Sequence, residues 1–179
     1  NWYVLRKVTC SLRRRDGQWQ TMSREAYDRG NGAALLLFDP RRSTVVLTRQ
    51  FRLPAFLNGC DVGPLIETCA GLLDGDDPET CIRREAEEET GYRVRQPRKV
   101  FEAYMSPGSV TEKLHFFIAE YEPGDRIRSG GGLEGEGEDI EVIEMPLAEA
   151  LAGIANGTIQ DGKTIMLLQH VALGWGRAP

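Results

Sequence analysis

Apolar and polar side chains alternate over residues 2–15 and again over residues 18–27, as in strands that have one face toward solvent. Asp16-Gly17 separates the two runs and predicts a hairpin with a type I′ turn. A two-stranded sheet has no core of its own, so we expect this hairpin to pack on the main domain or on another subunit. Its aromatic residues could stack on a nucleobase, although packing is their commoner use.

Farther along the chain the pattern changes from alternation to short, continuous apolar runs, which predict buried strands. These runs cover residues 33–38, 44–48, 65–69, 114–121 and 140–145. A further strand is expected over 94–104, interrupted by Pro97, and proline- and glycine-rich loops are expected at 53–64 and 106–113.

Helical patterns predict three helices. One begins at Pro78, with Asp77 as its cap, and ends before Gly91. The second runs from Pro146 to about Ala155. The third covers residues 164–173 and ends at Gly174.

The first helix is rich in acids. At 100° per residue, Glu85, Glu88 and Glu89 fall on one face beside Cys81, whereas Glu87 points away and is expected to face solvent. Three neighbouring carboxylates favour a divalent cation such as Mg²⁺, which takes oxygen ligands and bridges to substrate phosphates. Arg84 could orient a ligating carboxylate, and a solvated acidic helix is the alternative.

Two cations stand where they could meet a substrate. Arg52 follows the strand predicted over 44–48, and a guanidinium can clamp a phosphate with two hydrogen bonds. Lys163 precedes the last helix, where it could meet a phosphate or a sugar. An ordinary ion pair for Arg52 and simple solvation for Lys163 are the alternatives.

Composition narrows the class of protein. A chain of 179 residues with 41% hydrophobic and 27% charged residues is typical of one globular domain with an appendage. A net charge of −5 argues against general nucleic-acid binding. No apolar run approaches the roughly 20 residues that span a membrane, and no signal peptide opens the chain, so we expect a cytoplasmic protein. Since the sequence starts at Asn1, we expect residues to precede it.

The cysteines form no C-x-x-C pair and the two histidines lie far from a zinc spacing, so reduced thiols are expected and zinc is not. Residues 122–138 contain six glycines and several acids. Composition alone allows a disordered connector there, and a long loop of this kind inside a domain is also where mobile lids occur.

One stretch resembles a known family. The Nudix hydrolase signature has the pattern Arg-Glu-apolar-any-Glu-Glu-any-Gly-apolar, which this sequence matches at Arg84, Glu85, Ala86, Glu88, Glu89, Gly91 and Tyr92. The first half of the signature departs from the pattern, because Ala70 stands in place of its glycine and Asp76 in place of its first glutamate. Gly71 and Asp77 would fit only with a shift of one residue.

The likeness extends over most of the chain. The segments YDRGNGA (27–33), RQFR (49–52), AGLLDGDDPE (70–79), YMSPGSVTE (104–112), HFFIAEY (115–121), EDIEV (138–142) and DGKT (161–164) resemble the GDP-mannose pyrophosphatase branch of the ADP-ribose pyrophosphatase-like Nudix enzymes. This resemblance implies an α/β fold, an α/β/α sandwich with a mixed β-sheet. It also implies a homodimer in which an N-terminal β-hairpin, residues 1–28, reaches over the neighbouring subunit while residues 29–179 form the Nudix domain.

The resemblance also assigns roles to individual residues. It implies Mg²⁺, with Mn²⁺ as a substitute, on the backbone carbonyl of Ala70, the carboxylates of Glu85 and Glu89, and an acid of the glycine-rich loop. Glu138 is the best candidate for that acid, with Glu136 and Glu134 as alternatives. Substrate contacts are implied at Arg52, Ala70, Gly71, Leu72, Glu112 and Lys163, and from the partner subunit at Trp2, Ser23, Arg24 and Glu25.

The implied reaction is metal-assisted hydrolysis of a nucleoside diphosphate sugar, with GDP-mannose giving GMP and mannose 1-phosphate. Glu138 would position or deprotonate the attacking water, with Arg84, Glu85, Glu88 and Glu89 completing the catalytic set. The nearest alternative is the same chemistry on ADP-ribose or another nucleotide sugar. Two non-catalytic functions also stay open: a Nudix-like module that senses a nucleotide without hydrolysing it, and an acidic structural domain.

Overall fold

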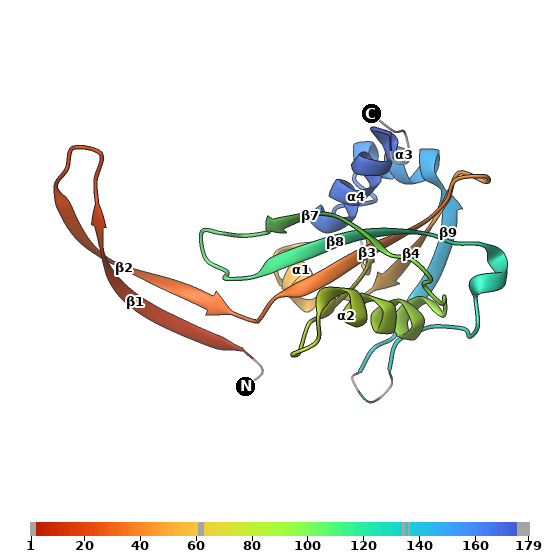
Figure 1. The fold of residues 1–179 in the computed structure, drawn as a ribbon, viewed down its shortest axis with the longest axis horizontal. Coiled ribbons are helices and arrows are strands. Elements are labelled where there is room, and N and C mark those ends of the chain that lie inside the picture. Colours follow the sequence, from red (N-terminus) through yellow and green to blue (C-terminus); the bar gives the residue numbers. More distant parts are fainter. Residues whose placement is uncertain (1–2, 61–62, 134, 136, 175–179) are drawn as a thin grey trace.

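A computed structural model describes residues 3–60, 63–133, 135 and 137–174. A mixed seven-stranded sheet forms the body of the molecule, in the order β5-β4-β3-β8-β7, with β6 paired to β3 and β9 paired to β4 (Figure 1). The strands are β3 (Gly32–Asp39), β4 (Thr44–Gln50), β5 (Leu65–Glu67), β6 (Cys69–Leu72), β7 (Arg98–Tyr104), β8 (Lys113–Glu120) and β9 (Glu141–Pro146). β3 runs parallel to β8, and the other pairings are antiparallel.

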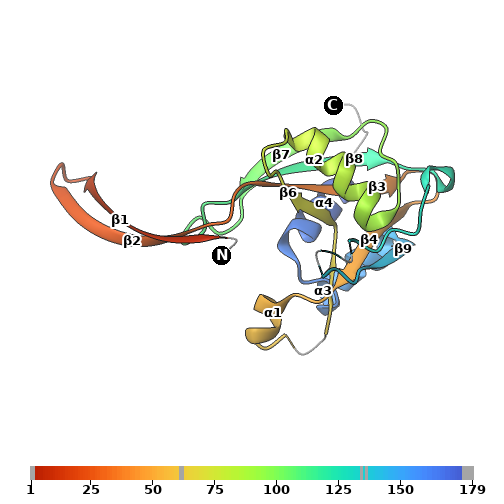
Figure 2. The same ribbon diagram turned by 90° about the horizontal axis from the view of Figure 1, so that it is seen from below.

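The central strand β3 separates two hydrophobic layers. Alternate β3 side chains belong to different clusters, Ala34 and Leu36 to one and Leu35 and Leu37 to the other. The first cluster packs against α3 (Leu147–Asn156) and α4 (Gly162–Ala172), and the second packs against α2 (Pro78–Glu85). These helices therefore cover opposite faces of the sheet (Figure 2), and the predicted α/β/α sandwich is confirmed.

The N-terminal hairpin forms a second, separate sheet. β1 (Val4–Arg13) pairs with β2 (Trp19–Asp28), and the ribbon extends away from the body (Figure 1). None of its described residues is buried, and apolar side chains such as Val8 and Leu12 remain exposed. Among the described residues, the hairpin is attached at its base, where the Tyr27 amide donates to the Ser109 carbonyl at 2.7 Å and the Thr111 amide donates to the Tyr27 carbonyl.

The hairpin turn differs from the prediction. Gly17 has a positive φ of 85°, whereas Asp16 does not, and a type I′ turn requires both. The Gly17 amide donates to the Arg14 carbonyl and the Arg14 amide donates to the Gln18 carbonyl. This is a three-residue loop, a type I turn closed by a glycine bulge, which needs only one left-handed residue.

Three other predictions need correction. The stretch predicted as loop contains the short helix α1 (Leu53–Leu57), because Pro54 is compatible with a first helical turn. The strand predicted over 65–69 is divided at Thr68, since β5 pairs with β4 and β6 pairs with β3. β7 begins only at Arg98, after Pro97. The part of the chain that the structure describes contains no helix both long and apolar enough to cross a membrane.

Candidate active site

The acidic helix begins at Pro78 and ends before Gly91, as predicted, but its last turn is not α-helical. The Asp77 carboxylate accepts from the amides of Glu79 and Thr80 at 3.0 and 3.1 Å, and the prediction of its cap is confirmed. The α-helical spacing stops at Glu85, and Ala86–Thr90 is a π-helix that ends at Gly91, whose φ is 78°. Wide turns of this kind are frequent at functional sites.

Glu89 of the π-helix is buried and forms no ion pair among the described residues. Its side chain lies against β6, where the nearby Cys69 thiol favours the ionised carboxylate. Glu89 is only 3% exposed, and its Oε2 has no hydrogen-bond partner among the described residues. Burial raises the pKa of Glu89 to about 8, the negative charges of Glu85 and Glu138 add to the rise, and the Cys69 thiol and Arg52 oppose it.

Glu85 ends α2 against the backbone of β6. Its carboxylate lies so close to Gly71 that a Cβ at that position would overlap it, which explains a glycine in the middle of this strand. Burial raises the pKa of Glu85 to about 7; Arg84 opposes the rise, and the negative charges of Glu88 and Glu138 add to it. Arg84 Nη1 lies 3.0 Å from both Glu85 Oε1 and Glu88 Oε2, so this guanidinium orients two of the acids.

The glycine-rich loop brings Glu138 to the same place. The charge of Glu138 raises the pKa of both Glu85 and Glu89, and its Oε2 accepts from the Leu133 amide at 3.0 Å. The alternative acids Glu134 and Glu136 lie outside the described residues. Residues 127–132 of this loop do not form a disordered connector, because their backbone is hydrogen-bonded to the end of the acidic helix.

This arrangement fits a divalent cation. A cation would supply the partner that Glu89 Oε2 lacks and would offset the burial and the repulsion that raise both pKa values. Hard carboxylate and carbonyl oxygens are the donors that Mg²⁺ prefers. Among the described residues, no three histidine, cysteine or acidic side chains lie close enough together to hold a metal ion by themselves.

A second buried acid, which the sequence reasoning missed, joins two of the predicted substrate residues. Arg52 donates to both Glu67 oxygens, at 2.6 and 3.1 Å, and Lys163 Nζ pairs with Glu67 Oε2. Lys163 also lies 3.0 Å from Asp161. The sequence contained a signal for this ion pair, because Glu67 lies inside an apolar strand and a buried glutamate needs a cationic partner.

The remaining predicted contacts are dispersed. Leu72 lies beside the acidic helix, where its carbonyl accepts from the Cys81 thiol at 3.1 Å. Glu112 pairs with Arg29 at 3.4 Å near the base of the hairpin. Residues 23–25 lie on β2, in the ribbon that leaves the body, and do not meet the acidic helix of their own chain (Figure 1). Trp2 lies outside the described residues.

Comparisons with known proteins agree with this geometry. Residues 1–27 match the family model described as the GDP-mannose pyrophosphatase NudK N-terminal domain, and residues 28–168 match that of the NUDIX domain. A GDP-mannose pyrophosphatase of Citrobacter koseri is 57% identical over 171 residues, which are 96% of this chain and 88% of that protein. The GDP-mannose pyrophosphatases of Escherichia coli O1:K1 and of Shigella dysenteriae serotype 1 are each 55% identical over 173 residues, 97% of this chain and 90% of theirs. Nudix enzymes generally depend on divalent metals, and this chain belongs to the Nudix hydrolase family.

Proposed function

We propose that this enzyme hydrolyses the pyrophosphate of GDP-mannose to give GMP and mannose 1-phosphate. The observation that carries the proposal is the buried carboxylate of Glu89, whose Oε2 has no hydrogen-bond partner among the described residues and whose pKa the charges of Glu85 and Glu138 raise further. The names of the relatives support GDP-mannose as the substrate. ADP-ribose or another nucleotide sugar is the alternative substrate.

Mg²⁺, with Mn²⁺ as a substitute, would be held by the Ala70 carbonyl and by the carboxylates of Glu85, Glu89 and Glu138. When bound, such an ion would supply neutralisation of pyrophosphate charge and activation of the attacking water. The support from this chain is the glycine opposite Glu85 and the unpartnered oxygen of Glu89. Arg84 keeps Glu85 and Glu88 in place through its two 3.0 Å contacts.

The protein side of the reaction is positioning and proton transfer. Water attacks one phosphorus in line, a new P–O bond forms, and the bridging P–O bond breaks to release the two monophosphates. Glu138 accepts the proton of the attacking water. Arg52 and Lys163 bind phosphate or sugar oxygens with the N–H groups that Glu67 leaves free, and Gly71, Leu72 and Glu112 complete the substrate contacts.

The hairpin completes the site of a second subunit. We assign residues 1–28 to this dimer-forming arm and residues 29–179 to the Nudix domain. An exposed two-stranded ribbon has too little apolar contact to be stable in water alone, which supports a partner surface for it. Trp2, Ser23, Arg24 and Glu25 would contact the nucleotide bound by the other subunit.

We place the enzyme in the cytoplasm. Cys10, Cys60, Cys69 and Cys81 are all free thiols, which supports a reducing compartment. No nucleic-acid partner is proposed, because the net charge of −5 gives no general attraction for phosphate backbones.

A substrate panel tests the activity. GDP-mannose, ADP-ribose and other nucleotide sugars are incubated with the protein and Mg²⁺, and the products are identified by mass. GMP and mannose 1-phosphate, formed fastest from GDP-mannose and abolished by EDTA, are expected. Faster cleavage of ADP-ribose would make ADP-ribose the substrate in place of GDP-mannose. No cleavage of any nucleotide sugar would favour a module that senses a nucleotide without hydrolysing it.

Subunit mixing tests the shared site. Glu89→Gln disables the metal side of a site, and a variant with alanine at Ser23, Arg24 and Glu25 disables the hairpin side. Each variant alone is expected to be nearly inactive, and unfolding and refolding them together should restore activity because some sites then combine two intact halves. Light scattering gives the oligomeric state. A monomer, or no recovery on mixing, would contradict the shared site.

A further inference from the structure

The segment 127–132 lies along the end of the acidic helix and is hydrogen-bonded to it by backbone groups. The amides of Gly131 and Gly132 donate to the carbonyls of Glu89 and Glu88 at 2.9 and 3.1 Å. The Ile127 amide donates to the Gly91 carbonyl at 2.8 Å. The last carbonyls of a helix have no partner within the helix. Here a distant loop satisfies them, in place of a further helical turn.

Glycine is required for this contact. A Cβ at Gly130 would overlap the backbone of Glu89, Thr90 and Gly91, and a Cβ at Gly91 would overlap the Arg128 carbonyl. Gly130 also has a positive φ of 71°, which L side chains rarely adopt. The two backbones therefore approach more closely than any other residue type allows.

The contact continues from Gly131 and Gly132 to Glu138. The Ile140 amide donates to the Gly131 carbonyl at 3.2 Å and closes the neck of the loop. The Glu138 carboxylate accepts from the Leu133 amide and lies against Gly132, where a Cβ would overlap it. Two hydrogen bonds in sequence thus connect the helix that carries Glu85 and Glu89 to the loop acid.

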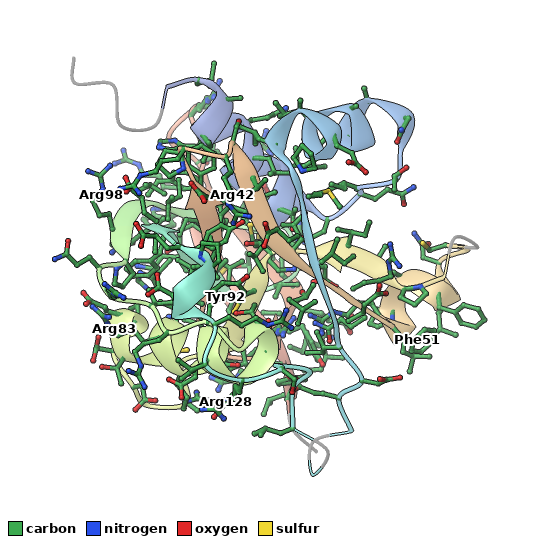
Figure 3. The ribbon with its side chains drawn as sticks, turned by 90° about the vertical axis from the view of Figure 1, so that its right-hand side faces the viewer. Arg42, Phe51, Arg83, Tyr92, Arg98 and Arg128 are labelled. Carbon is green, nitrogen blue, oxygen red and sulfur yellow. The ribbon has the colours of Figure 1, made fainter. Side chains whose placement is uncertain are left out.

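Side chains strengthen the same contact. Arg128 pairs with Glu87, so the prediction that Glu87 faces only solvent is wrong. Arg126 lies 6.0 Å from the centre of the Tyr92 ring, and the Tyr92 and Arg126 backbones form an isolated bridge. Arg128 and Tyr92 both lie next to the acidic helix (Figure 3). A cation such as Arg128 also stabilises the C-terminal end of a helix, which carries partial negative charge.

We propose that residues 126–133 are a clamp that sets the position of Glu138 relative to Glu85 and Glu89, and that Gly130 and Gly132 are its positioning residues. The inference rests on the proposed function, since it assigns Glu138 the proton of the attacking water. The π-helix thereby has a second role besides carrying Glu89. Its carbonyls that lack a partner within the helix accept the hydrogen bonds of the loop.

The main test replaces glycines. In Gly130→Ala and Gly132→Ala the clamp must shift, and a displacement of about 1 Å at the acid lowers kcat about a hundredfold. The KM for GDP-mannose should change less than about twofold, because the residues that bind the substrate stay in place. Gly124→Ala is the matched control, since Gly124 lies in the same loop with no atom near its Cβ position and no positive φ.

Hydrogen exchange tests the clamp without substrate. The amides of residues 131 and 132 should be protected in the wild type and in Gly124→Ala, and should exchange faster in Gly130→Ala. This readout stays valid even if no nucleotide sugar is hydrolysed, so the clamp and the proposed function can fail separately. Wild-type kcat in Gly130→Ala despite rapid exchange would overturn the clamp. Unprotected amides in the wild type would do so as well.

A double-mutant cycle tests the ion pair. Glu87→Gln, Arg128→Gln and the combined variant should each lower kcat by about twofold, the size expected for an exposed pair, and the effects should not add. Independent, additive effects would remove this pair from the clamp.

Discussion

Two glutamates of this enzyme are similarly buried but differ in their ion pairs. Glu67 is 2% exposed and Glu89 is 3% exposed. Burial opposes ionisation of Glu67, but Lys163 and Arg52 outweigh it and lower the pKa of that carboxyl, whereas the pKa of Glu89 rises to about 8 although Arg52 opposes the rise. Among the described residues, Glu67 has two cationic hydrogen-bond partners and Glu89 has no ion pair. This difference is the reason that we propose the metal at Glu89 and not at Glu67.

The largest expected effect comes from removing Glu89. Glu89→Gln should lower kcat about a thousandfold with Mg²⁺. This loss is larger than the roughly 10- to 100-fold loss expected when a residue that only supports a metal ligand is replaced. In EDTA at pH 8.5 the same variant should be more stable than the wild type by roughly 1–3 kcal/mol, because an uncompensated buried charge is gone. Activity assays and urea unfolding measure the two effects.

Glu79→Gln is the matched control for this experiment. Glu79 stands on the same helix and pairs with Arg83 at the surface, at 2.7 Å. Its removal should leave kcat unchanged and alter stability by at most about 0.5 kcal/mol. Near-normal turnover in Glu89→Gln would contradict its assignment as a metal ligand.

Glu67→Gln should have the opposite effect on stability. Breaking a buried ion pair leaves cations without their partner and costs about 3 kcal/mol of stability. Because Arg52 and Lys163 lose the acid that holds them, the KM for GDP-mannose should rise about tenfold, with a smaller change in kcat. A stabilised Glu67→Gln variant would show that the two glutamates do not differ as described.

The pH dependence of stability sharpens the contrast. The folded pKa values of Glu85 and Glu89 are about 7 and about 8, against 4.5 for an ordinary glutamate. Between pH 5 and 8 the folded state holds protons that the unfolded state has lost, so in EDTA stability should fall as pH rises, by up to about 1.4 kcal/mol per unit for each group. Mg²⁺ should oppose this slope, and Glu89→Gln should reduce it.

Glu67 should contribute to the pH dependence of stability with the opposite sign. Its pKa is lowered, so its contribution to stability is present above pH 4.5 and is lost only as the pH falls below that value. Urea unfolding at about pH 3, pH 6 and pH 9, with EDTA and with Mg²⁺, separates the two contributions. A flat profile in EDTA between pH 6 and pH 9 would contradict the raised pKa values of Glu85 and Glu89.

The smallest effect is expected at Cys69. Its thiol lies near Glu89 and favours the ionised carboxylate. Cys69→Ala should therefore raise the Mg²⁺ concentration needed for half-maximal activity at pH 7 by up to about tenfold, with little change in kcat at saturating metal. Cys69→Ser should restore most of the affinity, and a metal response identical to that of the wild type in Cys69→Ala would show that the thiol has no part in it.

Local sequence was sufficient for much of the fold and for part of the site. The buried strands, the Asp77 cap and the left-handed Gly91 were predicted because each depends on residues a few positions apart. The predictions failed where distant segments meet. The last turn of the helix is a π-helix because the carbonyls of Glu88 and Glu89 accept hydrogen bonds from the amides of Gly132 and Gly131. The spacing of residues within the helix does not reveal these distant partners.

By itself, the sequence determined the family, the acidic helix with its spacing, and the mixed sheet that carries it. Only the tertiary structure decided which acids are paired, because Glu67 and Lys163 are 96 positions apart and meet through the folding of the sheet. It also decided that Glu89 is buried with an oxygen that has no partner among the described residues, and that residues 127–132 of the glycine-rich loop are attached to the helix rather than free. Burial and charge pairing depend on distances in space, which neighbours along the chain do not define.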